Sequence, residues 1–382
     1  MARITRRHLL AETAGIAGLA SFPSFAAGKS DRLKITKVDV FQVVVPIKDD
    51  IINSPQFNPD SLSEFPKGPK IIVRLHTDSG LVGIGETSRN VAKTGALENA
   101  RHLTGKNALD LDLARLTLPN PATRSAFEIA LYDVVGKAFG WPVYQLLGGL
   151  AQEKVYIPYW CGRKNPVDAK RVAERTLNGG FTSLKMKGRL GDPIVEAVRA
   201  VKQVAPAVQI TVDFNRHYKT AEEFLPIGRA LDEIGNMRTI EDPVDNLPEL
   251  AKIAKALDTA ITLTPHNTKQ MVEAAKMGAC KLINTGPMPS MMSFVINVAV
   301  AGSLGMPCWH GSGHELGIRD AAMVHSCAAA ANCTLPSDIL SYQRVDDLIV
   351  KPIQIKDSYA IVPRDPGLGV ELDTDAVARY SV

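Results

Sequence analysis

Runs of β-branched residues and one amphipathic helix dominate the first part of the chain. The runs over residues 34–46 and 69–87 predict strands, and Asp78-Ser79-Gly80 inside the second run predicts a hairpin turn. The polar segment 49–67 between the runs is too long for an ordinary connection, and such loops in compact domains are commonly functional lids or disordered. Apolar residues spaced three and four apart predict a helix over residues 121–137. This combination predicts an α+β domain.

The pattern changes near residue 155, where short apolar strands begin to alternate with helical segments. Their spacing is roughly 22–30 residues, the length of one strand and helix pair. The predicted strand cores are residues 155–160, 183–187, 209–214, 239–242, 260–263, 281–284 and 306–309, with an eighth near 337–340. This alternation favours an α/β fold, a (β/α)8-type barrel of the (β/α)7β kind. A doubly wound open sheet is the alternative, but no GxGxxG turn follows the first strand.

These patterns divide most of the chain into three parts. Residues 28–149 form the predicted α+β domain, and residues 150–345 form the predicted barrel. The strand and turn chemistry of residues 361–370 predicts that the C-terminal segment 346–382 returns to the first domain after the barrel has closed.

The N-terminal segment 1–27 has the features of an export signal. Arg6 and Arg7 precede a Gly- and Ala-rich apolar run that ends near Ser24-Phe25-Ala26, the pattern of a twin-arginine signal with a small-residue cleavage site. The run is interrupted by polar residues and is shorter than the ~20 apolar residues of a membrane span, so we expect a removable signal rather than an anchor. A chance arginine pair before a helix is the alternative. The signal predicts a periplasmic protein with no membrane anchor after cleavage.

Composition and charge narrow the class of partner. The chain has 382 residues, of which 45% are hydrophobic and 22% charged, a profile that argues against a disordered, collagenous or coiled-coil protein. With 44 basic and 40 acidic residues the net charge is +4, which is too small for a nucleic-acid-binding surface. We therefore expect a small-molecule partner and no nucleic acid. The five cysteines include no CxxC pair and are interpreted as core thiols.

Polar residues at the ends of the predicted barrel strands carry the candidate chemistry, because the reacting groups of such barrels lie at the C-terminal strand ends. The second strand ends in Lys185-Met186-Lys187, and side chains alternate along a strand, so both lysines face the same way. Neighbouring ammonium groups lower each other's pKa, which is one way to make a lysine a base near neutral pH. The pair therefore predicts a general base.

Carboxylates follow at the ends of the next two strands. The third strand ends in Asp213-Phe214-Asn215 and the fourth in Glu241-Asp242-Pro243. Carboxylates that converge beside two lysines suit a hard divalent cation such as Mg²⁺. Such a cation holds a substrate carboxylate while a lysine removes the proton next to it. Each pattern alone is common by chance, but three at successive strand ends indicate a site.

The order of these motifs along the chain resembles the mandelate racemase and muconate lactonising group of the enolase superfamily. The resemblance covers nearly the whole chain after the predicted signal and includes residues 71–75, 80–86, 126–149 and 366–369 besides the strand-end motifs. It implies that the first domain caps the barrel and that the segment 49–67 is a lid. It also implies abstraction of a proton α to a carboxylate, with Mg²⁺ stabilising the enediolate.

The resemblance assigns roles to individual residues of this sequence. Asp213 and Glu241 match the first two metal ligands. Lys187 matches the base of the second strand, with Lys185 beside it. Asn215, on the same strand end as Asp213, is a candidate for contact with the substrate.

The third metal ligand departs from the family pattern. The family places an acidic residue at the end of the fifth strand, where this chain has Thr264-Pro265-His266-Asn267. If His266 is the ligand, its imidazole favours Mn²⁺ or Zn²⁺. If Asn267 supplies an amide oxygen, Mg²⁺ is plausible but bound more weakly than by three carboxylates. We expect Mg²⁺ held by Asp213 and Glu241, with the third position open between these two residues.

The opposite side of the predicted barrel also departs from the family. His310 matches a second acid or base at the end of the seventh strand, but the sixth strand ends in Asn284-Thr285-Gly286 without the usual aspartate. The lysine of cycloisomerases is replaced by the stretch Pro287-Met288-Pro289-Ser290. A hydrogen-bonded structural histidine is the alternative for His310. His314 and Glu315 follow within one turn and face either the substrate or solvent.

A base that faces a lone histidine predicts dehydration of a sugar acid or a related hydroxy acid, with Lys187 as the base and His310 protonating the departing hydroxyl. Racemisation or epimerisation of a carboxylate is an alternative, because bases on opposite faces of a carbon permit inversion, and cycloisomerisation is another. A further alternative is a barrel without catalysis that binds an anion in the periplasm. We also expect a homo-oligomer.

Overall fold

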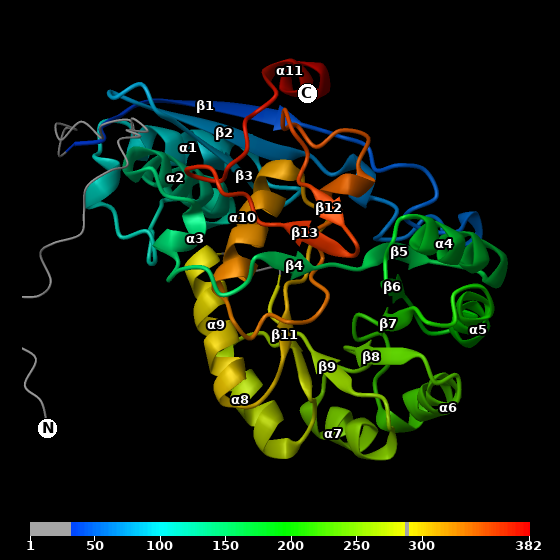
Figure 1. Cartoon of the computed structure of the whole chain (residues 1–382). Coiled ribbons are helices and arrows are strands. Elements are labelled where there is room, and N and C mark those ends of the chain that lie inside the picture. Colours follow the sequence, from blue (N-terminus) through cyan, green and yellow to red (C-terminus); the bar gives the residue numbers. More distant parts are fainter. Residues whose placement is uncertain (1–31, 287–289) are drawn as a thin grey trace, which may run out of the picture. The chain divides into compact units, whose positions relative to one another are not determined.

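The computed structural model describes residues 32–286 and 290–382 (Figure 1). The predicted export signal and residues 287–289 of the stretch after the sixth strand lie outside these ranges. Residues Leu33 to Val382 form one structural unit. Within the described ranges, no helix has the length and apolar character needed to cross a membrane.

An antiparallel sheet of three strands forms the centre of the first domain. Strand β1 (Ile35–Val43) pairs with β2 (Lys70–Thr77), and β2 pairs with β3 (Val82–Glu86) across a turn at Gly80. Gly80 has a φ of +80°, a left-handed conformation that glycine adopts without strain. The predicted strands and hairpin turn are therefore confirmed.

Helix α2 (Arg124–Phe139) packs directly on this sheet, because two glycines of β3 leave no side chain beneath the helix. A Cβ atom on Gly85 would lie 1.8 Å from the carbonyl oxygen of Ala126, and one on Gly83 would lie 2.1 Å from that of Ala130. Helix and sheet thus share a core with no space for a side chain between them. The helices of this part are α1 (Lys93–Leu103), α2 (Arg124–Phe139) and α3 (Val143–Leu146), with 3-10 turns η1 (Pro55–Phe57), η2 (Phe65–Lys67), η3 (Ala108–Asp110) and η4 (Pro121–Thr123).

Seven parallel strands form the second sheet, and each strand pairs with the next along the chain. The strands are β5 (Tyr159–Arg163), β6 (Ser183–Lys187), β7 (Gln209–Asp213), β8 (Met237–Glu241), β9 (Ile261–Leu263), β10 (Leu282–Asn284) and β11 (Cys308–Trp309). The helices that follow them are α4 (Pro166–Asn178), α5 (Ile194–Val204), α6 (Ala221–Asp232), α7 (Leu247–Ala256), α8 (Thr268–Met277), α9 (Met291–Ser303) and α10 (Gly317–Ala329).

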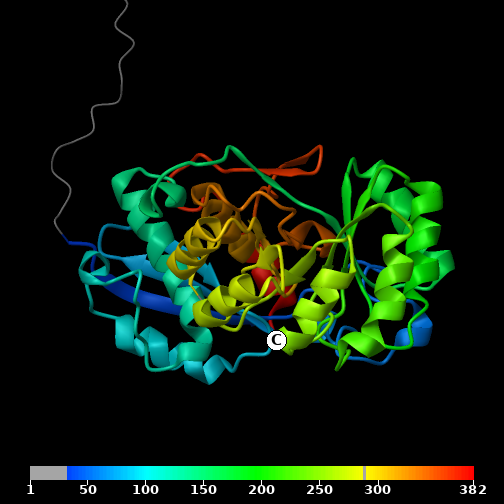
Figure 2. The same cartoon turned by 90° about the horizontal axis from the view of Figure 1, so that it is seen from below.

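The parallel sheet is curled, and helices such as α4, α5 and α6 lie on its outer side (Figure 1). Figure 2 shows the same arrangement from below, with the green helices at the outer edge. The α/β fold class and the capped barrel type predicted from the sequence are confirmed. The exact residue boundaries of the predicted domains remain predictions.

The predicted eighth strand near residues 337–340 is wrong. Its backbone N–H groups bind scattered partners: Ser337 donates to the carbonyl oxygen of Tyr156 at 2.8 Å, and Asp338 donates to that of His310 at 2.7 Å. A strand needs a regular ladder with one neighbour. The segment instead leads into the 3-10 turn η5 (Ser341–Gln343).

The first predicted strand core, residues 155–160, is divided between two sheets. Its beginning belongs to β4 (Lys154–Tyr156), which pairs with β13 (Tyr359–Ile361), and β13 pairs with β12 (Ile355–Lys356). Its end belongs to β5. Pro158 lies between the two strands, and its missing N–H cannot continue a ladder.

The C-terminal segment returns to the first domain, as predicted. The N–H of Val44, just after β1, donates to the carbonyl oxygen of Tyr380 at 3.0 Å, at the end of α11 (Thr374–Tyr380). Farther along the first domain, the N–H of Gly367 donates to the carbonyl oxygen of Trp141 at 2.9 Å. Backbone hydrogen bonds therefore join the two ends of the described chain.

The five cysteines are all described, all buried and all free of disulfides. Burial raises the pKa of Cys161, Cys280 and Cys308 to about 12, so these groups stay protonated thiols at neutral pH. The interpretation of the cysteines as core thiols is confirmed.

We predict that Gly85→Ala lowers the free energy of unfolding by about 1–3 kcal/mol, because the added methyl group must displace the backbone of α2. Gly302→Ala is the matched control, since it adds the same group at an exposed position inside α9, where the nearest atoms belong to the side chain of Asn332 at 3.3 Å rather than to backbone and alanine favours the helix. Urea denaturation followed by circular dichroism measures both variants. Equal stability of the two would contradict the close packing of α2 on β3.

Candidate active site

Strand pairing brings three of the predicted site residues together. Lys187 at the end of β6 is the register partner of Asp213 at the end of β7, and Asp213 is the partner of Glu241 at the end of β8. Neighbouring strands lie about 4.8 Å apart, so these side chains meet at one edge of the sheet. Lys185 precedes Lys187 by two residues and therefore faces the same side.

Lys185 is buried among three carboxylates. Its ammonium nitrogen lies 2.8 Å from Glu241 Oε2, 2.9 Å from Asp338 Oδ2 and 3.8 Å from Asp213 Oδ2. Burial alone lowers the pKa of this lysine, but the charges of Asp338, Glu241 and Asp213 together outweigh burial and raise it. The prediction that the two lysines lower each other's pKa is therefore wrong for Lys185.

Lys187 is the more accessible of the two lysines, with 13% of its side chain exposed against 4% for Lys185. Its ammonium group binds Asp213 Oδ2 and donates to Asn215 Oδ1 at 2.9 Å. The backbone N–H of Asn215 in turn donates to Asp213 Oδ1 at 2.9 Å. Asn215 therefore orients both the lysine and its carboxylate partner.

The carboxyl groups of this cluster differ in pKa. Burial raises the pKa of Asp213, but the ammonium groups of Lys187 and Lys185 outweigh it and leave this pKa lowered. Burial, followed by repulsion from Asp213, raises the pKa of Glu241. Burial and the neighbouring carboxylates raise the pKa of Asp242 to about 7. The cluster therefore holds ionised and protonatable carboxyl groups side by side near neutral pH.

Two further residues of the cluster were missed by the sequence-based prediction of site residues. Asp338 pairs with Lys185, and the side-chain amide of Asn284 donates to Glu241 Oε1 at 2.6 Å. Asn284 ends β10, so the rule of polar residues at strand ends identifies it. Asp338 lies in a segment that forms no strand, so that rule does not identify it.

Two cavities meet at Lys187. One cavity of about 250 Å³ is lined by the charge cluster, which consists of Lys185, Lys187, Asp213, Glu241 and Asp338. The other cavity, of about 780 Å³, extends to the first domain. Both are lined by Lys187, Asn215 and Ser312. The predicted lid segment 49–67 contributes Ser61, Leu62, Glu64 and Phe65 to the larger cavity. The segment therefore forms part of the wall above the lysine.

The structure places both predicted third ligands away from the two carboxylates. The side chain of His266 is 54% exposed, and its Nε2 lies 3.2 Å from Asp245 Oδ1. The side chain of Asn267 caps the start of α8. Thr264 occupies the position at the end of β9, with its hydroxyl 3.3 Å from Glu241 Oε1. Across the described ranges, no group of three His, Cys, Asp or Glu residues is placed to hold a metal ion.

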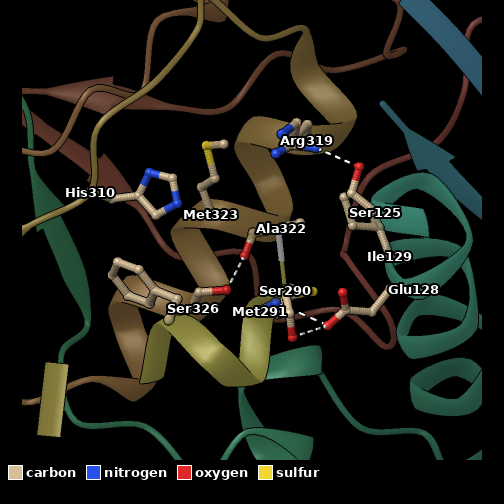
Figure 3. A pocket seen from close by; sticks show the side chains of 11 residues that line it. Ser125, Glu128, Ile129, Ser290, Met291, His310, Arg319, Ala322, Met323 and Ser326 are labelled. Carbon is tan, nitrogen blue, oxygen red and sulfur yellow. Dashed lines mark hydrogen bonds between the residues drawn. The ribbon is translucent and has the colours of Figure 1, made fainter. Parts of the chain in front are cut away.

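His310 lies in a separate small cavity, which Figure 3 shows from close by. Its ring packs against Phe294, with ring centroids 4.8 Å apart. Trp309 faces the charge cluster, with its ring centroid 5.7 Å from the Lys185 nitrogen, so the next side chain points to the other face. Burial lowers the pKa of His310 to about 4, which keeps the imidazole neutral. The expectation that His310 faces Lys187 across the substrate is therefore not met.

Glu128 of α2 closes the same small cavity. Its Oε1 accepts hydrogen bonds from the Ser290 hydroxyl at 2.9 Å and from the backbone N–H of Met291 at 3.0 Å, drawn as dashed lines in Figure 3. These bonds join the first domain to the start of α9. Burial raises the pKa of Glu128 to about 7, although the hydrogen bond from Ser290 opposes the shift.

His314 and Glu315 differ in their relation to the larger cavity. His314 is buried edge-on against Trp160, with ring centroids 4.3 Å apart, and neither ring nitrogen has a hydrogen-bond partner among the described residues. Glu315 lines the larger cavity and binds Lys70 of β2. Burial raises the pKa of Glu315, but Lys70 and Arg319 outweigh it and lower the pKa to about 2. Glu315 therefore stays ionised and paired with the first domain.

Comparisons with known proteins agree with this architecture. The model of the mandelate racemase / muconate lactonizing enzyme N-terminal domain matches residues 61–148, and that of the enolase C-terminal domain-like family matches residues 168–376. N-succinylamino acid racemase of Thermus thermophilus is 31% identical over 272 residues, 69% of this chain and 72% of that protein. L-Ala-D/L-Glu epimerase of Bacillus subtilis is 27% identical over 365 residues, 88% of this chain and 97% of that protein.

Among solved structures, an enolase from Thermobispora bispora complexed with magnesium and formate has a TM-score of 0.76 at 24% identity, covering 91% of this chain and 92% of that chain. The chain is therefore an enzyme of the capped-barrel class. It belongs to the mandelate racemase and muconate lactonizing enzyme group of the enolase superfamily, as its motifs predicted. Members of this superfamily bind Mg²⁺.

Glu128 provides a test of the joint between the two domains. Since its pKa rises from 4.5 to about 7 on folding, its protonated form contributes stability that is fully present below pH 4.5 and is lost as pH rises through 7. We predict that the free energy of unfolding of the wild type, relative to Glu128→Gln, falls by up to about 3 kcal/mol over this range. Denaturant titrations of both proteins between pH 4.5 and 8 measure the difference, and a difference independent of pH would contradict burial of a titrating carboxyl group.

Proposed function

We propose that the protein removes the proton α to the carboxylate of a small hydroxy acid and then eliminates water from the resulting enediolate. The position of Lys187 carries this proposal, because it lies where the two cavities meet and beside Asp213 and Asn215. If the α-carbon of a carboxylic acid lies at this junction, Lys187 is positioned on one face of that carbon by its contacts with Asp213 and Asn215.

The cavity of about 250 Å³, which is the smaller of the two that meet at Lys187, favours chemistry on one face of the substrate. Lys187 comes from β6, whereas the strand ends of β10 and β11 contribute Asn284, Gly286, Gly311 and Ser312, none of which has an ionisable side chain. Residues 287–289 are Pro, Met and Pro and carry no ionisable side chain either. Inversion by two bases needs one base on each face of the carbon. Elimination on one face needs a single lysine.

In the proposed reaction, Lys187 first releases a proton to solvent, and its neutral amine Nζ then accepts the α-proton while the electrons of the C–H bond pass into the enediolate. The bond between the β-carbon and its hydroxyl then breaks, and the hydroxyl takes a proton from Lys187 Nζ and leaves as water. The enol that remains from an α-hydroxy substrate tautomerises to a 2-keto acid. Lys187 thus replaces His310 as the acid, because His310 opens into a different cavity.

The strand ends beside Lys187 suit Mg²⁺, the ion bound in this superfamily. Asp213 and Glu241 supply carboxylates, and Thr264 and Asn284 place a hydroxyl and an amide next to Glu241. Oxygen ligands of this kind are those Mg²⁺ prefers. When bound, the ion stabilises the negative charge that develops on the substrate carboxylate. Mn²⁺ or Zn²⁺ loses its support, because the His266 imidazole lies away from these carboxylates.

Racemisation or epimerisation is the second candidate, and the names of the two relatives above favour it. It requires a second base, which the described lining of the smaller cavity does not offer on the β10 and β11 side. A retained carbon skeleton with inverted configuration and no 2-keto acid would decide for it. A protein that only binds an anion would give neither product nor exchange of the α-proton.

We also propose that the segment 1–27 directs export of the protein to the periplasm. We propose in addition that the protein forms a homo-oligomer. The export proposal rests on the arginine pair Arg6 and Arg7 before the apolar run. Cell fractionation tests the location, and size-exclusion chromatography with light scattering tests the oligomeric state; a cytoplasmic monomer would overturn both.

We predict that Lys187→Ala lowers exchange of the substrate α-proton with deuterated solvent by about 10²–10⁴-fold, because the general base is removed. A metal-supplemented library of sugar acids and hydroxy acids supplies the substrates, with 2-keto acid formation as the second readout. His310→Gln is the control and is expected to keep exchange and product formation close to the wild type, since the side chain lies in another cavity. Loss of product in the His310 variant with the fold intact would restore His310 as the acid.

For the metal, we predict that Thr264→Asp tightens Mg²⁺ binding by about tenfold, because it adds a third carboxylate beside Glu241. His266→Ala and Asn267→Ala are expected to leave Mg²⁺ affinity unchanged. Isothermal titration calorimetry of the three variants and the wild type measures these affinities. A loss of affinity in the His266 or Asn267 variant would instead identify that residue as a ligand.

A further inference from the structure

Arg89 is a charged side chain on the wall of the larger cavity that the proposed reaction does not use. It follows β3 in the first domain, and its guanidinium carbon lies 3.4 Å from the ring centroid of Phe65 on the predicted lid. Stacking on an aromatic ring fixes the plane of a guanidinium and leaves its N–H edge available. Among the described residues, Nη1 donates to the carbonyl oxygen of Gly313 at 2.5 Å, and the other donors have no partner of this kind.

The other basic side chains of this cavity are already paired or neutral. Lys187 binds Asp213, and Arg189 lies 2.9 Å from Asp60 Oδ2. Burial, reinforced by nearby arginines, lowers the pKa of His217, so this imidazole is neutral at pH 7. An incoming anion therefore finds no free positive charge on these three side chains.

The acidic side chains of the lining do not neutralise Arg89 either. Glu64 lies 3.0 Å from Lys67, and Glu315 binds Lys70. Within residues 32–286 and 290–382, no carboxylate forms an ion pair with Arg89. Burial lowers the pKa of Arg89, and the charge of Glu315 opposes that shift without forming an ion pair with the guanidinium. A half-buried cation without a partner is costly unless a ligand supplies the anion.

We propose that Arg89 binds a second carboxylate of the substrate, at the end of the molecule away from the carbon that Lys187 deprotonates. The substrate is then a dicarboxylic hydroxy acid. A guanidinium can hold a carboxylate by two parallel hydrogen bonds, which adds orientation to affinity. The cavity of about 780 Å³ accommodates a carbon chain between the two side chains. This inference rests on the proposed function for the role of Lys187, whereas the Arg89 site itself is a binding site.

The test uses the full chain with Mg²⁺ and compares binding of glutarate, adipate and pimelate with binding of the monoamide of each acid, by isothermal titration calorimetry. The wild type is expected to bind at least one dicarboxylate about tenfold or more tightly than its monoamide, since one charge-assisted contact is lost in the amide. Arg89→Gln is expected to remove this preference and Arg89→Lys to keep part of it. Arg189→Gln removes the same formal charge from the same cavity and is expected to keep the preference, because Arg189 is already paired with Asp60.

Three results would overturn the inference: no preference at any chain length, an unchanged preference in Arg89→Gln, or an equal loss in the Arg89 and Arg189 variants. Lys187→Ala separates the inference from the proposed function. That variant is expected to keep the preference for the dicarboxylate while α-proton exchange of dicarboxylic hydroxy acids is lost. A wild type that shows the Arg89-dependent preference without any exchange would support the Arg89 site and overturn the proposed reaction.

Discussion

The buried ammonium group of Lys185 is the charge on which the open end of the barrel depends. An unpaired charge at this depth costs several kcal/mol, so Lys185 requires Glu241 at 2.8 Å and Asp338 at 2.9 Å. Parallel pairing of β6, β7 and β8 supplies the first partner, and the irregular segment after α10 supplies the second. The same ion pairs therefore explain how the last segment closes this side of the barrel although it forms no strand there.

A second set of buried charges joins the first domain to the barrel. Lys70 of β2 lies 3.1 Å from Glu86 and also binds Glu315. The carboxylate of Glu86 accepts the backbone N–H groups of Leu316 at 2.8 Å and Arg319 at 2.9 Å, at the start of α10. Because these buried groups satisfy one another across the two domains, the network stabilises the position of the first domain on the barrel. Arg89 follows Glu86 by three residues and takes its position from this joint.

The alternation of side chains along short strands decides which residues at the strand ends reach Lys185 and its carboxylate partners. Trp309 turns its ring toward Lys185, and His310 is thereby directed into the small cavity against Phe294. At the end of β9, Thr264 lies beside Glu241, whereas His266 extends to the exposed Asp245. The lysines and carboxylates at the ends of β6, β7 and β8 lie together on one side of the cavity of about 250 Å³, whereas the ends of β10 and β11 contribute no ionisable side chain to it, and this difference supports the proposed reaction on one face of the substrate.

Local patterns in the sequence determined the order of strands and helices, the hairpin turn at Gly80, and the lysines and carboxylates at the ends of β6, β7 and β8. These features follow from the period of two in strands and from turn chemistry, which depend on nearby residues only. The tertiary structure alone decided that Asp338 partners Lys185 and that His310 faces away. It also decided that Arg89 lies over Phe65 with no ion pair to a carboxylate in the part of the chain that the structure describes. Each of these depends on how segments far apart in the chain pack and on which charges survive burial, and no local pattern of residues encodes those distances.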